Sequence, residues 1–443
     1  MPGPAPVHVS SDTNLPSSAD VVVIGGGIIG ACTALELAER GKSVVVLEKG
    51  EIGCEQSSRN WGWVRASRRD PREIPLMLEA IRAWEGMDTR TGRKTGYVQD
   101  GILFGASSAR IFARYERWTH NLTRHAMDCR MVSGAELDAL MPGHRLSIKG
   151  AMYTPKDGRA EPQWAAPAIA EAARAAGARV FTRCAARGLE TSAGRVGGVV
   201  TEKGRIACDA VVLAGGAWSR LFAGNHGVDL PQLKVLNSVL RTSRVADGPD
   251  VTLRTDRFAI RKRADGGYSI ASNHENTVDI VPDSFRLALR FWPAFKEEWR
   301  TLRFRLTERW KEEAALPRKW SLSEISPFEM RRILDPAPAP RMISGAWRSA
   351  QAAFPILESA EVVQAWGGMI DVTPDALPVI SGVADLPGFF IATGFSGHGF
   401  GIAPGAGRLM ADLVTEAPPV VDPTDFRLSR FHDGSRVELL TGD

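Results

Sequence analysis

Three glycines near the start of the chain have the spacing that a phosphate-binding turn needs. Gly25, Gly27 and Gly30 form a G-x-G-x-x-G pattern. In such a turn the first glycine permits a tight bend, the second lets the backbone approach a pyrophosphate, and the third allows close packing of the following helix. The N–H groups that open a helix then face the phosphate oxygens. The pattern predicts that these glycines, together with Ile28 and Ile29, hold a pyrophosphate.

A carboxylate follows at the distance that a ribose contact needs. Glu48 comes 18 residues after Gly30, at the end of a second apolar run, and Lys49 follows it. A carboxylate there accepts hydrogen bonds from both ribose hydroxyls and repels a 2′-phosphate. The alternative is a structural turn in an unrelated α/β protein, because glycine-rich turns often occur by chance. The glycines and Glu48 together favour an adenine dinucleotide site.

The surrounding segments predict the elements that position this site. Residues 21–24 form a fully apolar run, typical of a parallel strand that helices cover on both faces. Apolar residues then recur at helical spacing over residues 28–38 and stop before Gly41, and residues 43–47 form a second apolar run. Strand, turn, helix and strand in this order are the elements of a dinucleotide-binding unit.

Composition narrows the class of protein. The 443 residues, 44% of them hydrophobic and 24% charged, have an ordinary globular composition, which excludes a disordered or fibrous protein. The 55 Lys and Arg residues against 51 Asp and Glu leave a net charge of +4, so charge gives no reason to expect a nucleic-acid partner. The 44 glycines exceed the average share of roughly 7%, which makes their positions informative.

The cysteines and the N-terminal segment bear on the cellular compartment. The five cysteines include no CxxC pair and no nearby histidine at zinc-ligand spacing, which predicts a reduced protein without a structural metal. Residues 1–17 lack the charged start and long apolar core of a signal peptide, so we expect a flexible tail. The apolar stretch from Val21 is too short and interrupted to span a bilayer. We therefore expect a soluble, cytoplasmic protein without a membrane span.

Five further stretches resemble one family, in the family's order. They are Gln56-Ser57-Ser58-Arg59-Asn60-Trp61-Gly62-Trp63, Asp157-Gly158 with Glu161-Pro162, residues 211–218 (VVLAGGAW), Trp366-Gly367-Gly368 with residues 373–378 (TPDALP), and residues 392–399 (ATGFSGHG). The chain resembles the glycine oxidase/D-amino acid oxidase superfamily of FAD-dependent amine oxidoreductases. Within it, the chain resembles the S-x-R-N-x-G branch of γ-glutamylputrescine oxidase-like proteins.

This resemblance implies an α/β fold with two discontinuous domains. One is a Rossmann-like FAD-binding domain of the glutathione reductase type 2, and the other is an antiparallel α+β substrate-binding domain that covers the flavin. We expect the FAD-binding domain at residues 18–91, 153–229 and 356–418, the substrate domain at residues 92–152 and 230–355, and a C-terminal tail at residues 419–443.

The residues also indicate how the cofactor is held. Residues 57–60 form a donor-rich loop that suits pyrophosphate oxygens and the flavin edge, or else they cap a helix that begins near Arg72. Glycine-bearing strand ends after Ile24, Leu213 and Ala392 converge on one elongated ligand, which favours a resident FAD over NAD. No cysteine stands in the stretch before Pro374, so we expect non-covalent FAD.

The expected cofactor contacts outside the glycine turn come from several segments. A helix at about residues 404–413 is expected to follow the last of them, with its N-terminus near the anion that a reduced flavin carries. The contacts are Glu48, Lys49, Ser57, Ser58, Arg59, Asn60, Trp61, Gly62, Ala186, Ala214, Gly215, Trp218, Gly394, Gly397, His398, Gly399, Phe400 and Gly401.

One departure from the family bears on the substrate. Many relatives that oxidise amino acids place an arginine shortly before the Pro-Asp pair to bind the carboxylate, whereas this chain has Ile370, followed by Asp371. Either another arginine binds the carboxylate, with Arg65 and Arg348 as candidates, or the substrate is a polyamine-like or N-substituted amine. Asp371 then either meets an ammonium group or caps a turn before Pro374.

Histidines and tryptophans supply the remaining candidates. His398, in the last glycine-rich loop, either takes a proton and tunes the reduced flavin or is hydrogen-bonded within the loop. His274 lies at an expected strand end that faces the cavity. Trp61, Trp63 and Trp366 either form apolar walls that desolvate the amine or belong to the core, and for Trp63 we favour the wall. 

An amphipathic stripe lies in the second insertion. Trp292, Phe295, Trp299, Leu302, Leu306 and Trp310 follow one another at steps of three and four. Such a stripe suits a membrane surface or a partner, but its acidic neighbours disfavour an anionic lipid surface. We expect it to pack onto a sheet.

The favoured reaction is oxidation of the C–N bond of a primary or secondary amine or amino acid. Hydride transfer to FAD gives an imine, which hydrolyses to a carbonyl compound, and oxygen or a quinone then accepts the electrons. One alternative is a 2-hydroxy-acid or polyol dehydrogenase. Two others are a flavin protein acting on tRNA, which the small net charge disfavours, and a non-catalytic flavoprotein that binds a partner through the amphipathic stripe.

Overall fold

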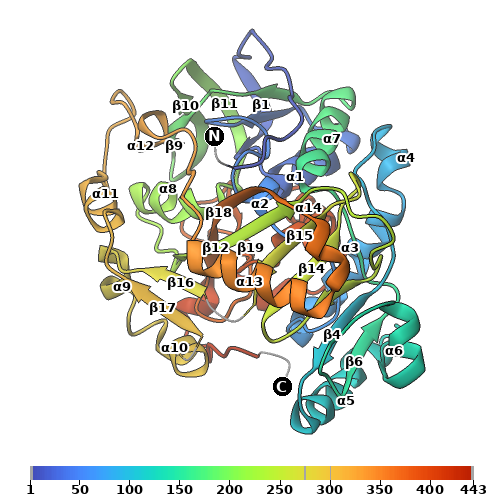
Figure 1. The fold of residues 1–443 in the computed structure, drawn as a ribbon. Coiled ribbons are helices and arrows are strands. Elements are labelled where there is room, and N and C mark those ends of the chain that lie inside the picture. The colour runs from blue at the N-terminus through green and yellow to red at the C-terminus, as the bar shows by residue number, and fades with distance from the viewer. Residues whose placement is uncertain (1–2, 274–275, 300, 441–443) are drawn as a thin grey trace.

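Two β-sheets, each assembled from segments far apart in the sequence, form the framework of the protein (Figure 1). The computed structural model describes residues 3–273, 276–299 and 301–440. Helices cover both sheets, and the chain passes between the two sheets several times. This arrangement confirms the expected α/β fold, with one Rossmann-like domain and one largely antiparallel domain.

The first sheet has a parallel centre. Its strands run in the order β19 (Val379–Gly382), β20 (Phe389–Thr393), β11 (Gly204–Leu213), β1 (Ser18–Ile24), β2 (Val44–Leu47) and β8 (Arg179–Phe181), and β10 (Arg195–Thr201) and β9 (Ala186–Ser192) extend it beside β11. The strands from β20 to β8 are parallel to one another, and β19 is antiparallel to β20. Because β1, β2, β11 and β20 are parallel, their carboxyl ends meet at one edge of the sheet.

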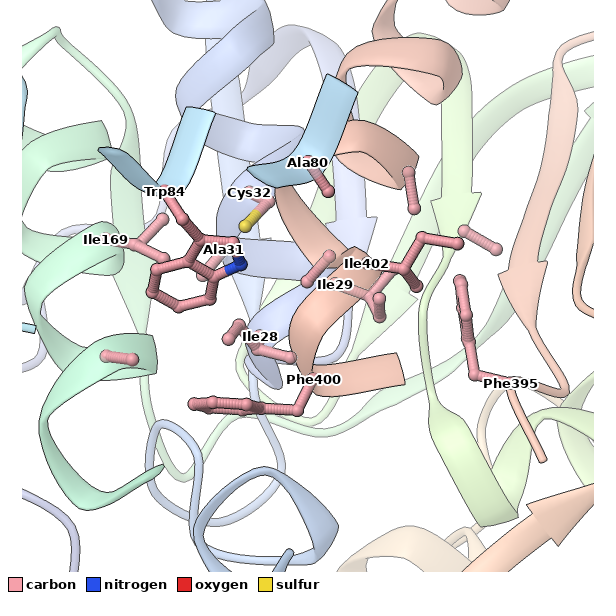
Figure 2. Packing of buried hydrophobic residues seen from close by; sticks show 14 of the residues in the cluster. Ile28, Ile29, Ala31, Cys32, Ala80, Trp84, Ile169, Phe395, Phe400 and Ile402 are labelled. Carbon is pink, nitrogen blue, oxygen red and sulfur yellow. The ribbon is translucent and has the colours of Figure 1, made fainter. Parts of the chain in front are cut away.

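One face of this sheet is covered by packed helices. They are α1 (Ile28–Glu39), α3 (Ile74–Glu85), α7 (Pro162–Ala175) and α14 (Gly399–Val414), with α4 (Met87–Thr91) beside α7. In Figure 2 the side chains of Ile29 and Ile402 lie close together, and Trp84 lies near Phe400. Gly407 lets α14 approach α1, because a Cβ there would come within 2.6 Å of the Cβ of Cys32. 

The second sheet is mostly antiparallel. Its strands run in the order β17 (Leu302–Arg305), β16 (Asn276–Asp279), β12 (Leu233–Thr242), β15 (Tyr268–Ser272), β14 (Phe258–Lys262), β13 (Thr252–Arg254), β4 (Ile102–Ala106), β6 (Gly150–Thr154) and β5 (Arg130–Val132), and β18 (Val362–Val372) pairs with β12. A short pair, β3 (Trp63–Val64) with β7 (Gly158–Arg159), lies apart from both sheets.

The strand register separates the two faces of the second sheet. On one face, Leu240, Leu253, Ile260 and Ile270 form a core with the long helix α13 (Pro340–Ala353), which lies across the sheet in Figure 1. On the other face, one row of paired residues crosses the sheet: Trp366, Val239, Ala271, Ala259, Arg254, Phe104 and Met152. Alternate residues of a strand point to opposite faces, so this second face carries Arg254 among mostly apolar neighbours.

The remaining helices and the 3-10 turns complete the chain. They are α2 (Gln56–Arg59), α5 (Ala109–Thr123), α6 (Gly134–Leu140), α8 (Ser219–Asn225), α9 (Pro282–Arg286), α10 (Trp292–Glu298), α11 (Arg309–Ala315) and α12 (Pro327–Met330), with the 3-10 turns η1 (Pro71–Glu73), η2 (Gly216–Trp218), η3 (Pro355–Ser359), η4 (Thr424–Phe426) and η5 (Leu428–Phe431). Over the part of the chain that the structure describes, no helix has the length and apolar composition to cross a membrane. The cytoplasmic location stays a prediction.

The domain boundaries need three corrections. β18 belongs to the second sheet, although residues 356–418 were assigned to the FAD-binding domain, because its long register with β12 decides its partner. The N-terminal segment is not a free tail: Val9 is buried, and Asp12 exchanges hydrogen bonds with Val180 of β8. The C-terminal segment is also packed at Phe426, and Arg430 forms a buried ion pair with Asp375. 

The amphipathic stripe does not form one helix, and it packs onto a sheet only in part, where Phe295 contacts Phe304 of the edge strand β17. The chain over this segment breaks into α10, β17 and α11. Trp292, Trp299 and Leu306 are more than half exposed, while Phe295 contacts both Trp292 and Phe304. A periodic pattern indicates that apolar residues share one face of an element, but it does not indicate what packs against that face. Here the apolar side chains partly cover one another.

A buried ion pair joins the two domains. Glu161, just before α7, accepts hydrogen bonds from Nη1 of Arg261 in β14 at 2.7 Å and from the N–H of Ala264 at 2.8 Å. Both charged side chains are almost completely buried. Removing one charge of such a pair leaves the other uncompensated in a region of low dielectric.

We therefore expect Glu161→Gln to lower the free energy of unfolding by about 3 kcal/mol or more. Guanidinium denaturation of the FAD-loaded protein measures this change. The matched control is Glu79→Gln, which breaks an ion pair with the exposed Arg82 and is expected to cost at most about 1 kcal/mol. Equal losses in the two variants would show that the Glu161–Arg261 pair does not join the domains energetically.

Candidate active site

The first cavity lies where the parallel strands of the first sheet end. It spans about 1210 Å³, open solvent at its mouth included, and its walls include Ile24, Leu47, Leu213 and Ala392, which lie at or near the carboxyl ends of β1, β2, β11 and β20. Ligands bind at this edge in open α/β sheets, because loops and helix N-termini meet there. The cavity therefore has the position of a dinucleotide site.

The glycine turn forms one end of this cavity. Gly25 has a φ of +112°, and a Cβ on Gly30 would come within 2.0 Å of the Gly25 carbonyl oxygen, so both positions require glycine. Gly27, Ile28 and Ile29 line the cavity at the start of α1. The first turn of a helix thus faces the cavity, as anion binding requires.

Glu48 supports the turn and also borders the cavity. One of its carboxylate oxygens accepts a hydrogen bond from the N–H of Gly26 at 2.7 Å, and the other accepts from the N–H of Gly50 at 2.6 Å. Burial raises the pKa of this carboxyl, while the two backbone N–H groups and Lys49 act in the opposite direction. The carboxylate is thereby oriented at the cavity wall, where the sequence places a ribose contact.

Most of the expected cofactor contacts line the first or the second cavity. Those on the first are Gly25, Gly27, Ile28, Ile29, Glu48, Lys49, Ser57, Asn60, Ala186, Ala214, Gly215, Trp218, Gly397, Gly399 and Phe400. The neighbouring second cavity is bordered by Trp61, His398 and Gly401, and also by Asn60, Gly397 and Phe400. The structure thus brings together residues that are up to about 380 positions apart in the chain.

Arg59 and its neighbours depart from the expected donor loop. Nη1 of Arg59 donates to Asp335 at 2.5 Å and to the carbonyl of Gly367 at 3.0 Å, so its charge is already paired inside the protein. The Ser58 hydroxyl is buried and donates to the carbonyl of Glu55. The loop therefore contributes Ser57 and Asn60 to the first cavity, while Ser58 holds the loop in place and the paired Arg59 borders the second cavity. 

Two further glycines that were expected at the cofactor contact other parts of the protein instead of the first cavity. Gly62 lies against the carbonyl of Ala160 and the guanidinium of Arg261, and Gly394 donates its N–H to the Asp371 carboxylate. Neither residue lines the first cavity. The last helix of this region, α14, begins at Gly399 and not near residue 404, because Pro404 is accommodated inside it. Its N-terminus consequently reaches the cavity itself.

The residues of the first cavity fit an FAD. The side-chain oxygen of Gln56 is buried without a hydrogen-bond partner in the described part of the chain, and Gln56 borders both cavities. A buried acceptor without a donor is costly, so a ligand donor at this point satisfies it. The glycine turn suits a pyrophosphate, Glu48 suits a ribose, and the Gln56 oxygen suits a polar ring edge.

A second cavity adjoins the first. It spans about 1160 Å³, open solvent included, and shares Gln56, Asn60, Gly397 and Phe400 with the first cavity. Trp61 and Trp63 form an edge-to-face pair with centroids 5.3 Å apart on its wall, and the second sheet supplies Asn237 and Arg254. This cavity has the position of the substrate site.

Three arginines concentrate positive charge at the second cavity. The guanidinium groups of Arg65 and Arg254 both contact the Phe104 ring, at 5.7 and 5.6 Å from its centroid. Among the described residues neither forms an ion pair, whereas Arg69 lies 3.4 Å from Glu73. Burial, aided by Arg69 and Arg254, lowers the pKa of Arg65 to about 9, so it is still protonated at neutral pH.

Ile370 and Asp371 have separate environments. Ile370 lines the second cavity beside Gly397, so the wall is apolar at the position where the family resemblance implies an arginine. The Asp371 carboxylate accepts hydrogen bonds from the Gly394 N–H at 2.7 Å and the Thr393 hydroxyl at 3.2 Å. Burial raises its pKa. Asp371 thus holds the loop after β20 and borders the first cavity, so it does not face the substrate cavity.

The other substrate candidates fall into two groups, those that line the second cavity and those that do not. Trp63 and Arg65 line the second cavity. Arg348 lies on the exposed side of α13, and Trp366 is buried in a small core and donates to the carbonyl of Arg59 at 3.0 Å. Neither lines either cavity, so the structure does not place them with the substrate. His274 lies outside the described residues.

Sequence reasoning missed several cavity residues. Arg254 and Asn237 lie in strands of the second sheet, and only strand pairing places them opposite Phe104 and Gly368. Arg69, which borders the second cavity, and the buried Glu73 that pairs with it both precede α3. Gln56 stands inside the family-like stretch but was not counted as a contact.

Comparisons with known proteins agree with this geometry. A family model described as FAD dependent oxidoreductase (DAO) matches residues 20–413. The solved structure of L-amino acid deaminase from Proteus myxofaciens in complex with anthranilate has a TM-score of 0.93 and 36% identity to this chain, with 97% of each chain covered. 

Two curated relatives are more distant. Glycine oxidase from Geobacillus kaustophilus is 27% identical over 93% of this chain and 97% of its own length. Human mitochondrial sarcosine dehydrogenase is 26% identical over 94% of this chain but only 42% of its own length, so this chain spans less than half of that relative. The match over residues 20–413 and the dinucleotide cavity at the ends of four parallel strands lead to one conclusion: the chain belongs to the DAO family of FAD-dependent oxidoreductases.

Proposed function

We propose that this protein oxidises the C–N bond of an amino acid or N-substituted amino acid to an imine, which hydrolyses to a carbonyl compound. Oxygen or a quinone then accepts the electrons. The observation that carries this proposal is the guanidinium of Arg65, which borders the cavity next to the FAD site and has no ion-pair partner among the described residues. The names of the relatives, an L-amino acid deaminase, a glycine oxidase and a sarcosine dehydrogenase, support it.

The charge of the cavity disfavours an uncarboxylated polyamine. A polyamine needs several acidic partners, whereas Arg65, Arg69 and Arg254 line this cavity and, among the described lining residues, Glu298 is the one carboxylate. Asp371, the carboxylate expected to meet an ammonium, is turned to the loop after β20. We therefore favour a substrate with a carboxylate over the polyamine-like substrate that Ile370 left open. The γ-glutamylputrescine oxidase-like branch stays a prediction.

The residues of the second cavity position such a substrate and limit its contact with water. FAD, when bound, supplies the two-electron oxidation of the carbon that bears the amine. Arg65 binds the carboxylate through its planar fork of N–H donors, which fixes the orientation of the neighbouring carbon. Trp61 and Trp63 form an apolar wall that displaces water from the amine. His398, which also borders this cavity, is placed to take a proton.

Anaerobic reduction of the bound flavin tests the proposed reaction. We expect amino acids or N-substituted amino acids to bleach the flavin absorbance, and the matching amines without a carboxylate to do so at least about 100-fold more slowly, because they lose the charged contact with Arg65. A panel of 2-hydroxy acids is the control for the alternative reaction. Bleaching by hydroxy acids alone would exclude amine oxidation, and bleaching by polyamines alone would exclude the carboxylate contact.

A further inference from the structure

A buried carboxylate faces a histidine ring at the wall of the second cavity. Glu73, at the end of η1, is completely buried, and its Oε2 lies 3.5 Å from Nδ1 of His398. Within the described residues, neither Nδ1 of His398 nor Oε1 of Glu73 has a hydrogen-bond partner. Unsatisfied buried polar atoms are costly. A proton on Nδ1, directed at Glu73, is the arrangement that lowers this cost.

The same arrangement leaves the other ring nitrogen available. The imidazole of His398 is 27% exposed although Nδ1 is buried, and the residue lines the second cavity, so the edge that carries Nε2 borders the cavity. When Nδ1 of a neutral imidazole carries the proton, Nε2 has the free lone pair. His398 thus offers a proton acceptor on the cavity side and a carboxylate contact on the buried side.

Cations from neighbouring segments oppose protonation of this ring. Arg65 and Arg69 follow β3, and Nη2 of Arg69 donates to the His398 carbonyl at 2.9 Å. Asp157, whose carboxylate accepts from the N–H groups of Ala66 and Ser67, lies behind them. Burial lowers the pKa of His398 to about 4, with Arg65 and Arg69 acting in the same direction and Glu73 in the opposite one. The ring is therefore neutral at neutral pH before substrate binds.

We propose that His398 accepts the ammonium proton of the substrate on Nε2, that Glu73 is the positioning residue for this transfer, and that a carboxylate bound at Arg65 promotes it. An N–H bond of the ammonium breaks and an N–H bond of the imidazole forms, so the amine keeps its lone pair and no electrons are transferred. The charge created on His398 is balanced by Glu73. This inference rests on the proposed function because it requires a carboxylated substrate with an ammonium group.

The coupling to Arg65 has a physical cause. A carboxylate beside Arg65 offsets the positive charge that opposes protonation of His398, so the bound anion raises the pKa of the ring. Linkage is reciprocal, so a proton on His398 must strengthen anion binding by the same factor. The effect is measurable with an anion that has no amine and does not react.

Benzoate binding to the FAD-loaded protein provides this measurement. Followed by the change in flavin absorbance, the benzoate Kd is expected to fall about tenfold from about pH 8 to about pH 5, because the pKa of His398 rises when the anion is bound. This pH dependence is expected to disappear in His398→Gln and to shrink in Glu73→Gln. Benzamide, which has no charge, is the matched ligand control. An unchanged pH dependence in His398→Gln would overturn the proposal.

Kinetics separate a proton-transfer role from a structural one. In Glu73→Gln and His398→Gln, kcat/KM for the amino acid that best reduces the flavin is expected to fall about 100-fold near pH 7. The loss is expected to diminish toward about pH 10, where the solution removes the ammonium proton without help. Glu79→Gln is the control, because Glu79 lies in α3 and outside both cavities. This variant is expected to retain wild-type kcat/KM.

The outcomes distinguish the two proposals. An equal loss at every pH in both variants would contradict proton transfer to His398 and leave the proposed oxidation intact. Absence of flavin reduction by any amino acid in the wild-type protein would instead contradict the proposed function, and the benzoate experiment would still report the coupling between Arg65 and His398. If Glu73→Gln does not fold, the benzoate and kinetic measurements on His398→Gln still test the proposal.

Discussion

Replacing Arg65 by alanine is expected to raise the KM for a carboxylated substrate by about 100-fold, because removing one partner of a charged contact costs about 2–5 kcal/mol and each 1.4 kcal/mol is about tenfold. The KM for the matching amine without a carboxylate is expected to change far less. Steady-state kinetics on the two substrates measure the difference. The variant should fold, because the change removes a partly buried cation that has no ion-pair partner among the described residues and that lies near Arg69 and Arg254.

Arg348→Ala is the matched control for this experiment. The sequence offers Arg65 and Arg348 as equal candidates for the carboxylate, but the structure places Arg348 on the exposed side of α13. The control is therefore expected to leave both KM values unchanged. An equal rise in both KM values for Arg65→Ala would remove Arg65 as the carboxylate contact, and a rise in Arg348→Ala would require a different substrate site.

Replacing Gly27 by leucine is expected to yield a folded protein that contains at least about tenfold less flavin, because a side chain inserted at a tight contact costs about 1–3 kcal/mol or more. A Cβ at Gly27 meets only the Ser57 hydroxyl, at 3.1 Å, and φ at this position is −71°, so the protein itself tolerates the change. The added side chain instead occupies the space of the pyrophosphate. The ratio of flavin to protein absorbance measures the effect.

Two other glycines provide controls for this prediction. Gly30→Leu is expected to prevent folding, because its Cβ would come within 2.0 Å of the Gly25 carbonyl oxygen. Gly345→Leu, in α13, is expected to retain the full flavin content, since a Cβ there meets nothing within 4 Å. A yellow Gly27→Leu protein with wild-type flavin content would contradict the phosphate-turn assignment.

The glycine turn shows how far local spacing leads. Strand, turn, helix and second strand here lie within about thirty residues, and the roles of Gly25, Gly30 and Glu48 depend mainly on backbone geometry within this short segment. The hairpin of β14 and β15 around Gly266, whose φ is +82°, is likewise built from neighbouring residues. Predictions based on neighbouring residues were therefore close to the structure.

Predictions about polar side chains were less accurate where several partners compete. Arg59 was expected at the cofactor because of its charge, but Asp335, 276 positions later, pairs with it. Asp371 was expected at the substrate or at a turn, and the Gly394 N–H and Thr393 hydroxyl orient it instead. A charged side chain turns to the partner that best offsets its desolvation, and that partner is defined by the fold.

The residue pattern alone predicted the α/β class, the dinucleotide turn and the membership of a flavoenzyme family. These features depend on short-range spacing and on the order of motifs along the chain. The substrate cavity depended on the tertiary structure. Strand pairing places Arg254 beside Phe104, and the packing of η1 against the start of α14 places Glu73 beside His398. Each of these contacts joins segments more than 100 residues apart, and only the folded chain brings such segments together.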